Sequence, residues 1–292
     1  MDIERVGVVG CGLMGSGIAE VAAKANFDVI VREMSEDLIE AGRDRIRKSL
    51  GRAVEREKLT GADRDAAWSR LRFSTELSEL ADRDLVIEAI VEEIGNKNEL
   101  FSALDDLCGP EAIFASNTSS LTITDMAAAT KRPDRVVGLH FFNPVPVMEL
   151  VEVVRTIATS DEVFSAAFAF AEALGKKPIT AKDNSGFVVN LLLVPYMLDA
   201  IRQLERGVAS MEDIDQAMTL GLGHPMGPFT LCDFVGIDTV YRISEIMFEE
   251  YREARYAPPP LLKRVVSMGR FGRKTGKGFY DWSGEQPTPL PL

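Results

Sequence analysis

Residues 6–17, VGVVGCGLMGSG, join a short apolar run to a glycine-rich turn and then to the first residues of a helical pattern. The glycines Gly10, Gly12 and Gly15 have the spacing G-x-G-x-x-G. Between a strand and a helix, the first glycine permits a tight turn, the second lets the backbone approach a pyrophosphate, and the third allows close helix packing. The helix N-terminus adds free N–H groups that attract phosphate. The stretch therefore predicts a dinucleotide-binding βαβ unit; a glycine turn without a ligand is the alternative.

The dinucleotide is expected to be NAD. A second apolar run, residues 28–31, is followed by Glu33, which lies 21 residues after Gly12. A carboxylate there accepts hydrogen bonds from the ribose hydroxyls and repels a 2′-phosphate. Arg32 beside it could hold that phosphate, so NADP stays an alternative. The predicted cofactor contacts around this turn are Gly10, Gly12, Leu13, Met14, Gly15 and Glu33.

The first part of the chain, residues 1–183, alternates apolar runs with helical patterns. Apolar runs without polar alternation are typical of strands buried on both faces of a parallel sheet. Helix start signals, such as Ser35 and Thr60, lie between the runs. Repeated β-α-β units predict a Rossmann-type, doubly wound α/β domain. The predicted strands are residues 5–9, 28–31, 85–90, 112–115 and 136–139, with a further candidate in 148–154.

The second part, residues 184–292, lacks such runs and is predicted to be an all-helical domain. Its first helix, FVVNLLLVPYMLDAIRQLE, is apolar nearly all round until Asp199, which indicates burial on every side. A small lobe can achieve that burial against a second subunit, so we expect a homodimer formed through this domain. The Pro-rich end, residues 286–292, is expected to be disordered. The predicted helices cover residues 187–206, 210–221, 228–254 and 260–268.

The composition excludes several classes of protein. Of 292 residues, 46% are hydrophobic and 27% are charged, which is too apolar for a disordered chain. The net charge of −12 disfavours nucleic acid and anionic membranes as partners, and no apolar stretch reaches the ~18 residues of a membrane span. The three cysteines lie far apart without metal-ligand spacing, so we expect no metal. These thiols, and a start without a basic leader, predict a cytoplasmic protein.

His140 is the main candidate for a catalytic residue. It follows an apolar run and precedes the turn FFNPVP and the strand candidate MELVEVV. If the two runs form an antiparallel hairpin centred near Pro146, residue i faces residue 292 − i, and His140 faces Glu152. Facing side chains have Cβ atoms ~5 Å apart, so an imidazole–carboxylate pair suited to a general base can form. The alternative is a structural histidine, which is our interpretation of His224 in LGHPMGPF.

Three polar residues are further candidates. Ser119 lies in ASNTSS, directly after a buried strand, where ligands bind in open α/β sheets. Asn190 is an isolated amide within an apolar helix and needs a hydrogen-bond partner, which either the protein or a ligand supplies. Asn143 lies in the turn after His140 and either caps that turn or contacts a ligand.

Residues 43–58 form a basic stretch in this acidic chain, with seven basic and three acidic side chains. Arg45, Ser49, Arg52 and Arg56 follow one another at helical spacings of 4, 3 and 4 and so share one face. Such a face suits a polyanionic small molecule, and a merely solvated face is the alternative. Nucleic acid is a weaker candidate because aromatic residues are not interleaved.

With these motifs the sequence resembles the 3-hydroxyacyl-CoA dehydrogenase family, and most of all its short, single-function 3-hydroxybutyryl-CoA type. The resemblance covers nearly the whole chain, and HFFNPVPVMELVEV is specific to this family rather than to dinucleotide-binding proteins in general. The segments that carry it are GCGLMGSG, LVIEAIVEE with NKNELF, FASNTSSLTIT, GLHFFNPVPVMELVEVV, LGKKPITAKDNSGFVVN, ERGVASMEDID, LGHPMGPFTLCDFVGIDT and FGRKTGKGFY.

The resemblance implies catalytic roles. His140 would take the proton of the substrate's C3 hydroxyl while hydride leaves C3 for C4 of the nicotinamide. Glu152 would orient the imidazole and stabilise its charge. Ser119 and Asn190 would hold the C3 oxygen.

The resemblance also implies binding roles. Glu33 would bind the adenosine ribose, and the phosphates of an acyl-CoA substrate would meet Ser49 and Arg56, with Arg52 nearby. The rest of the NAD site would comprise Glu92, Lys97, Ser119, Asn143 and Lys274.

Two positions depart from the family pattern. Leu191 stands where an arginine is usual, and Glu93 stands where an asparagine is usual. Neither belongs to the predicted base pair, so the expected activity is NAD-dependent interconversion of (S)-3-hydroxyacyl-CoA and 3-oxoacyl-CoA. Two alternatives stay open: a dehydrogenase of a free 3-hydroxy acid or sugar acid on the same fold, and a protein that binds NAD without turnover.

Overall fold

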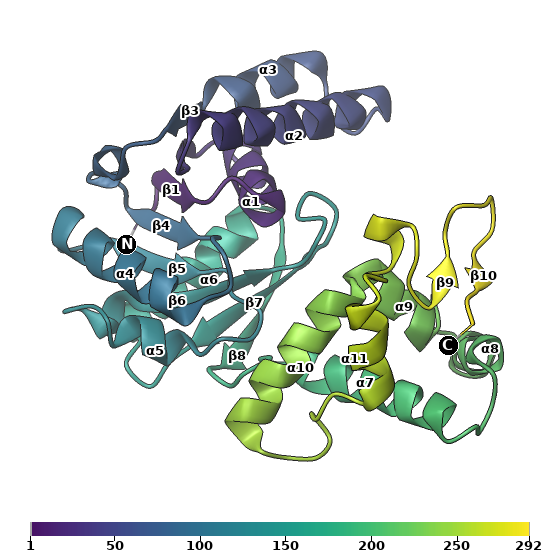
Figure 1. Cartoon of the computed structure of the whole chain (residues 1–292). Coiled ribbons are helices and arrows are strands. Elements are labelled where there is room, and N and C mark those ends of the chain that lie inside the picture. Colours follow the sequence, from purple (N-terminus) through teal and green to yellow (C-terminus); the bar gives the residue numbers. More distant parts are fainter. Residues whose placement is uncertain (1, 292) are drawn as a thin grey trace. The chain divides into compact units, whose positions relative to one another are not determined.

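The computed structural model describes residues 2–291, which form two compact units. The first unit ends at Asn184 and the second begins at Ser185. Figure 1 shows a sheet flanked by helices in the first unit and a group of helices in the second. None of the helices built from residues 2–291 is both long and apolar enough to cross a membrane.

An eight-stranded sheet forms the centre of the first unit, in the order β3-β2-β1-β4-β5-β6-β7-β8. Strands β1 to β6 run parallel, whereas β7 is antiparallel to β6 and parallel to β8. The Rossmann-type, doubly wound domain that the sequence predicts is therefore confirmed. The strands are β1 (Arg5–Val9), β2 (Asp28–Arg32), β3 (Leu71–Ser74), β4 (Leu85–Glu88), β5 (Ile113–Ser116), β6 (Val136–Phe141), β7 (Leu150–Arg155) and β8 (Lys177–Lys182).

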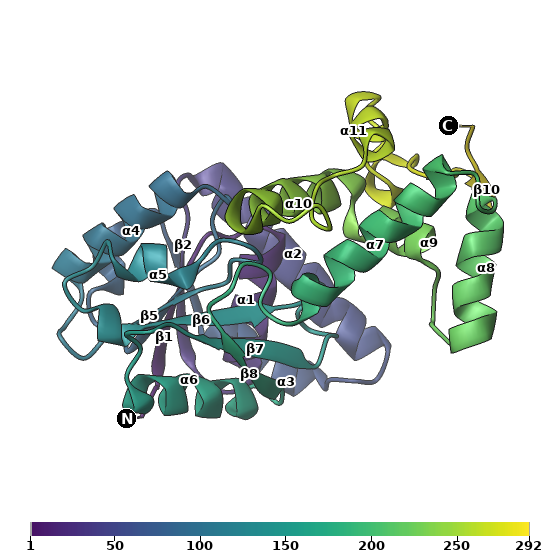
Figure 2. The same ribbon diagram turned by 90° about the horizontal axis from the view of Figure 1, so that it is seen from below.

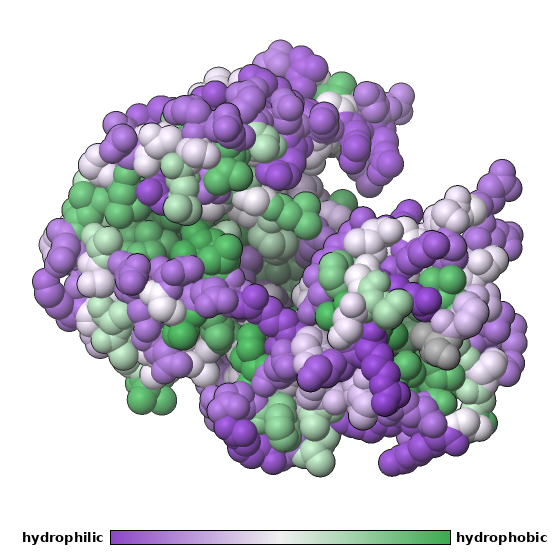
Figure 3. Space-filling model, viewed as in Figure 1, coloured by the Kyte–Doolittle hydropathy of each residue, from purple (hydrophilic) through white to green (hydrophobic). Residues whose placement is uncertain are grey.

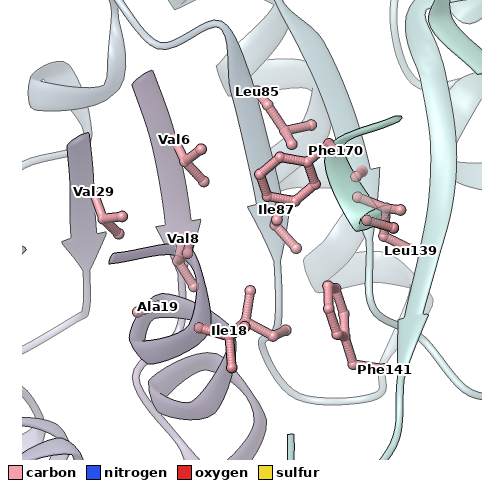
Figure 4. Packing of buried hydrophobic residues seen from close by; sticks show 14 of the residues in the cluster. Val6, Val8, Ile18, Ala19, Val29, Leu85, Ile87, Leu139, Phe141 and Phe170 are labelled. Atoms are coloured by element: carbon pink, nitrogen blue, oxygen red, sulfur yellow. The ribbon is translucent and has the colours of Figure 1, made fainter. Parts of the chain in front are cut away.

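Helices cover both faces of this sheet, and Figure 2 shows α4 and α5 on the face opposite α6. On one face, Ile18 of α1 and Phe170 of α6 pack against strand residues such as Ile87 (Figure 4). On the other, Phe101 of α4 meets Phe114 of β5 with ring centroids 6.2 Å apart. Each such buried side chain contributes roughly 1.5–3 kcal/mol. The helices are α1 (Leu13–Lys24), α2 (Glu36–Glu55), α3 (Gly61–Ser69), α4 (Ile94–Leu107), α5 (Ile123–Ala127) and α6 (Asp161–Ala173), with 3₁₀ turns η1 (Leu77–Leu80) and η2 (Pro133–Arg135).

The second unit is mainly helical, as predicted, with two differences. Gly236, with a φ of +101°, breaks the predicted helix 228–254 into α9 and α10. The short strands β9 and β10 pair as an antiparallel ribbon, so the expectation of disorder is wrong for the tail up to Pro291. The elements are α7 (Val189–Glu205), α8 (Met211–Leu222), α9 (Pro228–Val235), α10 (Ile237–Tyr251), α11 (Pro260–Ser267), η3 (Arg273–Thr275), β9 (Tyr280–Asp281) and β10 (Thr288–Pro289).

Helix α7 is less buried in the single chain than its sequence indicates. Val194 and Leu198 lie in the core of the second unit, but the side chain of Leu192 is 67% exposed. Asn190 and Leu191, in the first turn, are partly exposed. The exposed positions are those that the prediction buries against a second subunit, and that burial stays a prediction.

Candidate active site

The glycine turn has the geometry that a dinucleotide requires. Gly10 has a φ of +97°, and a Cβ added to it would lie 2.5 Å from the carbonyl oxygen of Ala89. A Cβ on Gly15 would lie 1.9 Å from the carbonyl oxygen of Gly10, so helix and turn are in direct contact there. A Cβ on Gly12 would meet nothing within 4 Å. The second glycine therefore faces open space, as expected where a pyrophosphate approaches the backbone.

The start of α1 is equally open to an anion. Gly12 is the residue before the helix, and no side chain of residues 2–291 caps it or places an acid in its first turn. Leu13 is 64% exposed, while Met14 packs against the core. The helix dipole therefore acts on the space beside the turn, which favours phosphate.

Glu33 lies against the same turn. Its Oε2 accepts a hydrogen bond from the backbone N–H of Cys11 at 2.7 Å, and its Oε1 accepts one from Met34 at 2.7 Å. Each carboxylate oxygen keeps a further lone pair for a ribose hydroxyl. The guanidinium of Arg32 donates through Nε to the carbonyl of Thr75 at 3.2 Å. The residues present therefore fit NAD.

A buried ionic cluster lies where β4 and β5 end. The ammonium of Lys97 is 2.6 Å from Oε1 of Glu88 and 3.1 Å from Oε2 of Glu92. Ser116 donates through Oγ to the other Glu88 oxygen at 2.5 Å. The side chains of Lys97 and Glu88 are 2% and 0% exposed. Glu88 was not predicted as a site residue, although an acid at the last position of the apolar strand LVIE is a signal for one.

Glu92 connects this cluster to the loop that carries Ser119. Its Oε1 accepts hydrogen bonds from the Thr118 hydroxyl at 2.5 Å, the Ser119 N–H at 3.2 Å and the Ser120 hydroxyl at 3.1 Å. Burial alone would raise the pKa of Glu92, but the charge of Lys97 and these donors outweigh it and lower the pKa. The structure thus brings together Glu92, Lys97 and Ser119, three residues predicted for one site.

His140 and Glu152 face each other across β6 and β7, in the register predicted from the sequence. The imidazole Nδ1 lies 2.6 Å from Oε2 of Glu152, and the two side chains are 5% and 0% exposed. His140 lies within β6, which continues to Phe141. With Nδ1 donating to the carboxylate, Nε2 is the nitrogen that can accept a proton. This geometry is compatible with the general base that the sequence predicts.

Asn117, which was not predicted as a site residue, connects this pair to the neighbouring strands. Its backbone N–H donates to the carbonyl of Glu88 at 2.9 Å, and its Oδ1 accepts from the N–H of Phe141 at 2.9 Å. Asn143 lies in the turn between β6 and β7, is exposed, and precedes Pro144 through a cis peptide bond. The ends of β4, β5 and β6 therefore lie together at the site.

The basic stretch divides into two faces on α2, over which hydrophilic residues gather in Figure 3. Arg43 and Arg47 pair with Glu40 at 3.3 and 3.2 Å. On the predicted face, Arg52 and Arg56 are exposed, and neither forms an ion pair with another residue of 2–291. These two cations are free to bind an anion.

Two other residues of the predicted basic face have protein partners. Arg45 donates to the carbonyl of Cys11 at 3.0 Å, which attaches α2 to the glycine turn. The Ser49 hydroxyl faces the buried carboxylate of Glu20 in α1, whose pKa is raised by burial although Ser49 lowers it. The Ser49 hydroxyl can therefore bind a ligand only if it keeps its hydrogen bond to Glu20 at the same time or gives that bond up.

Three candidates lie in the second unit. Asn190 is in the first turn of α7 and is partly exposed. Lys274 lies in η3, and its ammonium is 2.7 Å from Oδ2 of Asp238. Nδ1 of His224 lies 3.4 Å from the Tyr196 hydroxyl, in an exposed contact. The interpretation of His224 as structural stays a prediction.

Models of one protein family match nearly the whole chain. The model of the 3-hydroxyacyl-CoA dehydrogenase NAD binding domain matches residues 5–184, and that of the C-terminal domain matches residues 186–282. A curated relative from Mycobacterium tuberculosis, named 3-hydroxybutyryl-CoA dehydrogenase, is 55% identical over 282 residues, which cover 96% of this chain and 99% of the relative.

Two solved structures are similar along almost their full lengths. The crystal structure of FadB2 from M. tuberculosis has a TM-score of 0.95 and 54% identity, and the match covers 97% of this chain and 100% of that one. The crystal structure of (S)-3-hydroxybutyryl-CoA dehydrogenase PaaH1 from Ralstonia eutropha has a TM-score of 0.93 and 43% identity, with the same coverage. The chain therefore belongs to the 3-hydroxyacyl-CoA dehydrogenase family and is an NAD-dependent oxidoreductase.

Proposed function

We propose that this chain oxidises (S)-3-hydroxyacyl-CoA, with 3-hydroxybutyryl-CoA as the substrate, to 3-oxoacyl-CoA, and catalyses the reverse reaction. The observation that carries the proposal is the buried pair of His140 and Glu152 at a 2.6 Å separation, in a unit that also has the NAD turn. The names of the 55% identical relative and of the R. eutropha structure support the choice of substrate.

In the proposed mechanism the substrate loses a hydride from C3 and a proton from the C3 hydroxyl, and each goes to a different acceptor. Bound NAD supplies the acceptor for the hydride that leaves C3 of the substrate. His140 accepts the proton of the C3 hydroxyl at Nε2, while the O–H electron pair forms the carbonyl. Glu152 stabilises the resulting imidazolium through Nδ1, and in the reverse direction His140 returns the proton. Ser119 and Asn190 hold the C3 oxygen in this proposal.

The unpaired cations of α2 supply the recognition of coenzyme A in this proposal. A CoA thioester carries phosphates that a free 3-hydroxy acid lacks, and Arg52 and Arg56 present two exposed guanidinium groups for them. Charge-assisted hydrogen bonds from arginine to phosphate are about twice as strong as neutral ones. The same face therefore distinguishes the thioester from the free acid.

Replacing Arg52 and Arg56 together by glutamine is expected to raise KM for acetoacetyl-CoA by at least tenfold, since a hydrogen bond to a charged group contributes ~1.5–3 kcal/mol. KM for the N-acetylcysteamine thioester of acetoacetate, which has no phosphate, should not change. The matched control is Arg43 and Arg47 replaced by glutamine, which alters the charge equally on the Glu40 side of the helix. An unchanged KM for acetoacetyl-CoA in the first variant would contradict recognition by this face.

Replacing Gly12 by alanine is expected to leave the fold intact and to weaken NADH binding by at least tenfold. A methyl group at Gly12 meets no protein atom within 4 Å, so it occupies the space proposed for the pyrophosphate. Replacing Gly15 instead drives Cβ against the Gly10 carbonyl and should lower the melting temperature. NADH fluorescence and thermal unfolding separate the two effects; wild-type affinity in Gly12→Ala would place the pyrophosphate elsewhere.

The homodimer and the cytoplasmic location stay predictions. Exposed apolar side chains on the second unit support an interface there; they include Leu192 at 67%, Leu220 at 79% and Leu222 at 65% exposure. Sedimentation equilibrium of the whole chain tests the dimer, and a monomer at micromolar concentration would contradict it. The location rests on the three cysteines, all of which are free thiols and buried.

A further inference from the structure

The turn between β6 and β7 connects the two strands that carry His140 and Glu152. It spans residues 142–149. A turn of this length is not held in one conformation by its own backbone hydrogen bonds alone. Two hydrogen bonds form inside it, from the N–H groups of Val147 and Met148 to the carbonyl of Pro144, both at 2.9 Å. Any further order in this turn has to come from outside it.

Lys176 supplies an attachment from outside. It follows α6 and directly precedes β8, and its ammonium donates to the carbonyl of Val145 at 2.6 Å and to that of Met148 at 2.8 Å. One side chain therefore holds two points of the turn with charge-assisted hydrogen bonds. The neighbouring Lys177 also reaches the turn, at its last residue, but its ammonium pairs with the carboxylate of Glu149 in a solvent-exposed contact, where an ion pair contributes little.

The same turn is packed against the helix that follows the glycine turn. Val145 is only 2% exposed, and a Cβ added to Gly17 of α1 would lie 2.9 Å from its Cβ. The α1 residue Glu20, itself 2% exposed, acts electrostatically on Lys176, and one of its oxygens has no hydrogen-bond partner among residues 2–291. Burial lowers the pKa of Lys176, with the charge of Lys24 acting in the same direction and that of Glu20 opposing it.

We infer that Lys176 is a positioning residue for the proposed reaction. Its ammonium fixes the 142–149 turn on α1, and thereby holds both the strand ends that carry His140 and Glu152 and the turn residue Asn143. The inference rests on the proposed function, and it gives a residue outside the proposed active site a role in that reaction. Since displacing reacting groups by about 1 Å can cost ~10²-fold in rate, loss of this attachment acts on kcat.

Lys176→Met tests the inference, with Lys177→Met as the matched control and Lys176→Arg as the conservative variant. Lys176→Met is expected to lower kcat with acetoacetyl-CoA and NADH by about tenfold without changing KM for acetoacetyl-CoA. Amide exchange at Val147 and Met148 should become faster in the same variant. Lys177→Met should match the wild type in both measurements. Lys176→Arg, which keeps N–H donors, should recover most of kcat.

The outcomes separate this inference from the proposed function. One outcome is that the wild type turns over while Lys176→Met keeps the wild-type kcat, with or without a change in melting temperature. In that case the positioning role is refuted and the proposed function stands. A loss of equal size in Lys177→Met also refutes the positioning role, because the removal of either lysine beside this turn would then have the same effect. If Lys176→Met does not fold, Lys176→Gln is judged by the same criteria. A wild type without turnover of the thioester refutes both.

Discussion

Replacing His140 by glutamine is expected to lower kcat by about 10²–10⁴-fold, because a positioned general base contributes that much to proton transfer. Glutamine has an amide in place of the imidazole and cannot accept the C3 proton at neutral pH. NADH affinity should be retained, since the variant changes neither the glycine turn nor Glu33. Steady-state turnover and NADH fluorescence measure the two quantities on one sample.

The chain contains its own control for this variant. His224 is the second of its two histidines and contacts Tyr196 at an exposed position, so His224→Gln should keep wild-type turnover. Glu152→Gln should also lower kcat, because the amide cannot compensate the charge of the imidazolium. Turnover near the wild-type value in His140→Gln would remove the general base from the mechanism.

Replacing Lys97 by methionine is expected to lower the free energy of unfolding by about 3–5 kcal/mol, the typical cost of breaking a buried ion pair from one side. Glu88 is fully buried, and it would lose the ammonium 2.6 Å away. Ser116 and the N–H of Ile90 would remain as its donors. Urea denaturation measures the change.

An exposed pair provides the comparison. Lys131 lies 2.6 Å from Asp106, with side chains 81% and 66% exposed, so Lys131→Met should cost less than about 1 kcal/mol. Adding Glu88→Gln to Lys97→Met should restore part of the lost stability, because one of the two carboxylates that lose the ammonium of Lys97 is then replaced by a neutral amide. If Lys97→Met costs no more than Lys131→Met, the cluster at the ends of β4 and β5 is not the electrostatic unit described above.

The sheet could be predicted where the sequence carries a strong local signal. Central strands such as β1 and β4 are continuous apolar runs because both of their faces are covered. Ser35 and Thr60 start α2 and α3 as predicted, by accepting hydrogen bonds from backbone N–H groups three residues later.

The unpredicted elements lack such signals. β3 has only four residues, and β8 is an edge strand in which Ala181 is the one buried residue. The break between α9 and α10 depends on the positive φ of Gly236. A glycine allows this conformation, but the presence of a glycine in the sequence does not predict it. The exposure of Leu192 is a tertiary property that helical periodicity does not report.

In the site, a contact could be predicted from the sequence only where its two residues lie close together along the chain. The pairing of His140 with Glu152 follows from hairpin symmetry, so it could be derived from one turn. The contact of Ser49 with Glu20 joins two helices and depends on how they pack, which no local pattern contains. The partners of Glu88 could not be predicted for the same reason, since Lys97 and Ser116 come from α4 and β5; the acid at the end of LVIE was a local signal for Glu88 alone.

The most direct test is NADH absorbance with the purified chain and acetoacetyl-CoA, run beside free acetoacetate at equal concentration. The proposed function predicts NADH oxidation with the thioester and none with the free acid, with 3-hydroxybutyryl-CoA as the product. Turnover of the free acid alone would contradict the proposed substrate and favour a hydroxy-acid dehydrogenase on the same fold. Binding of NADH without turnover of either compound would contradict the proposed reaction.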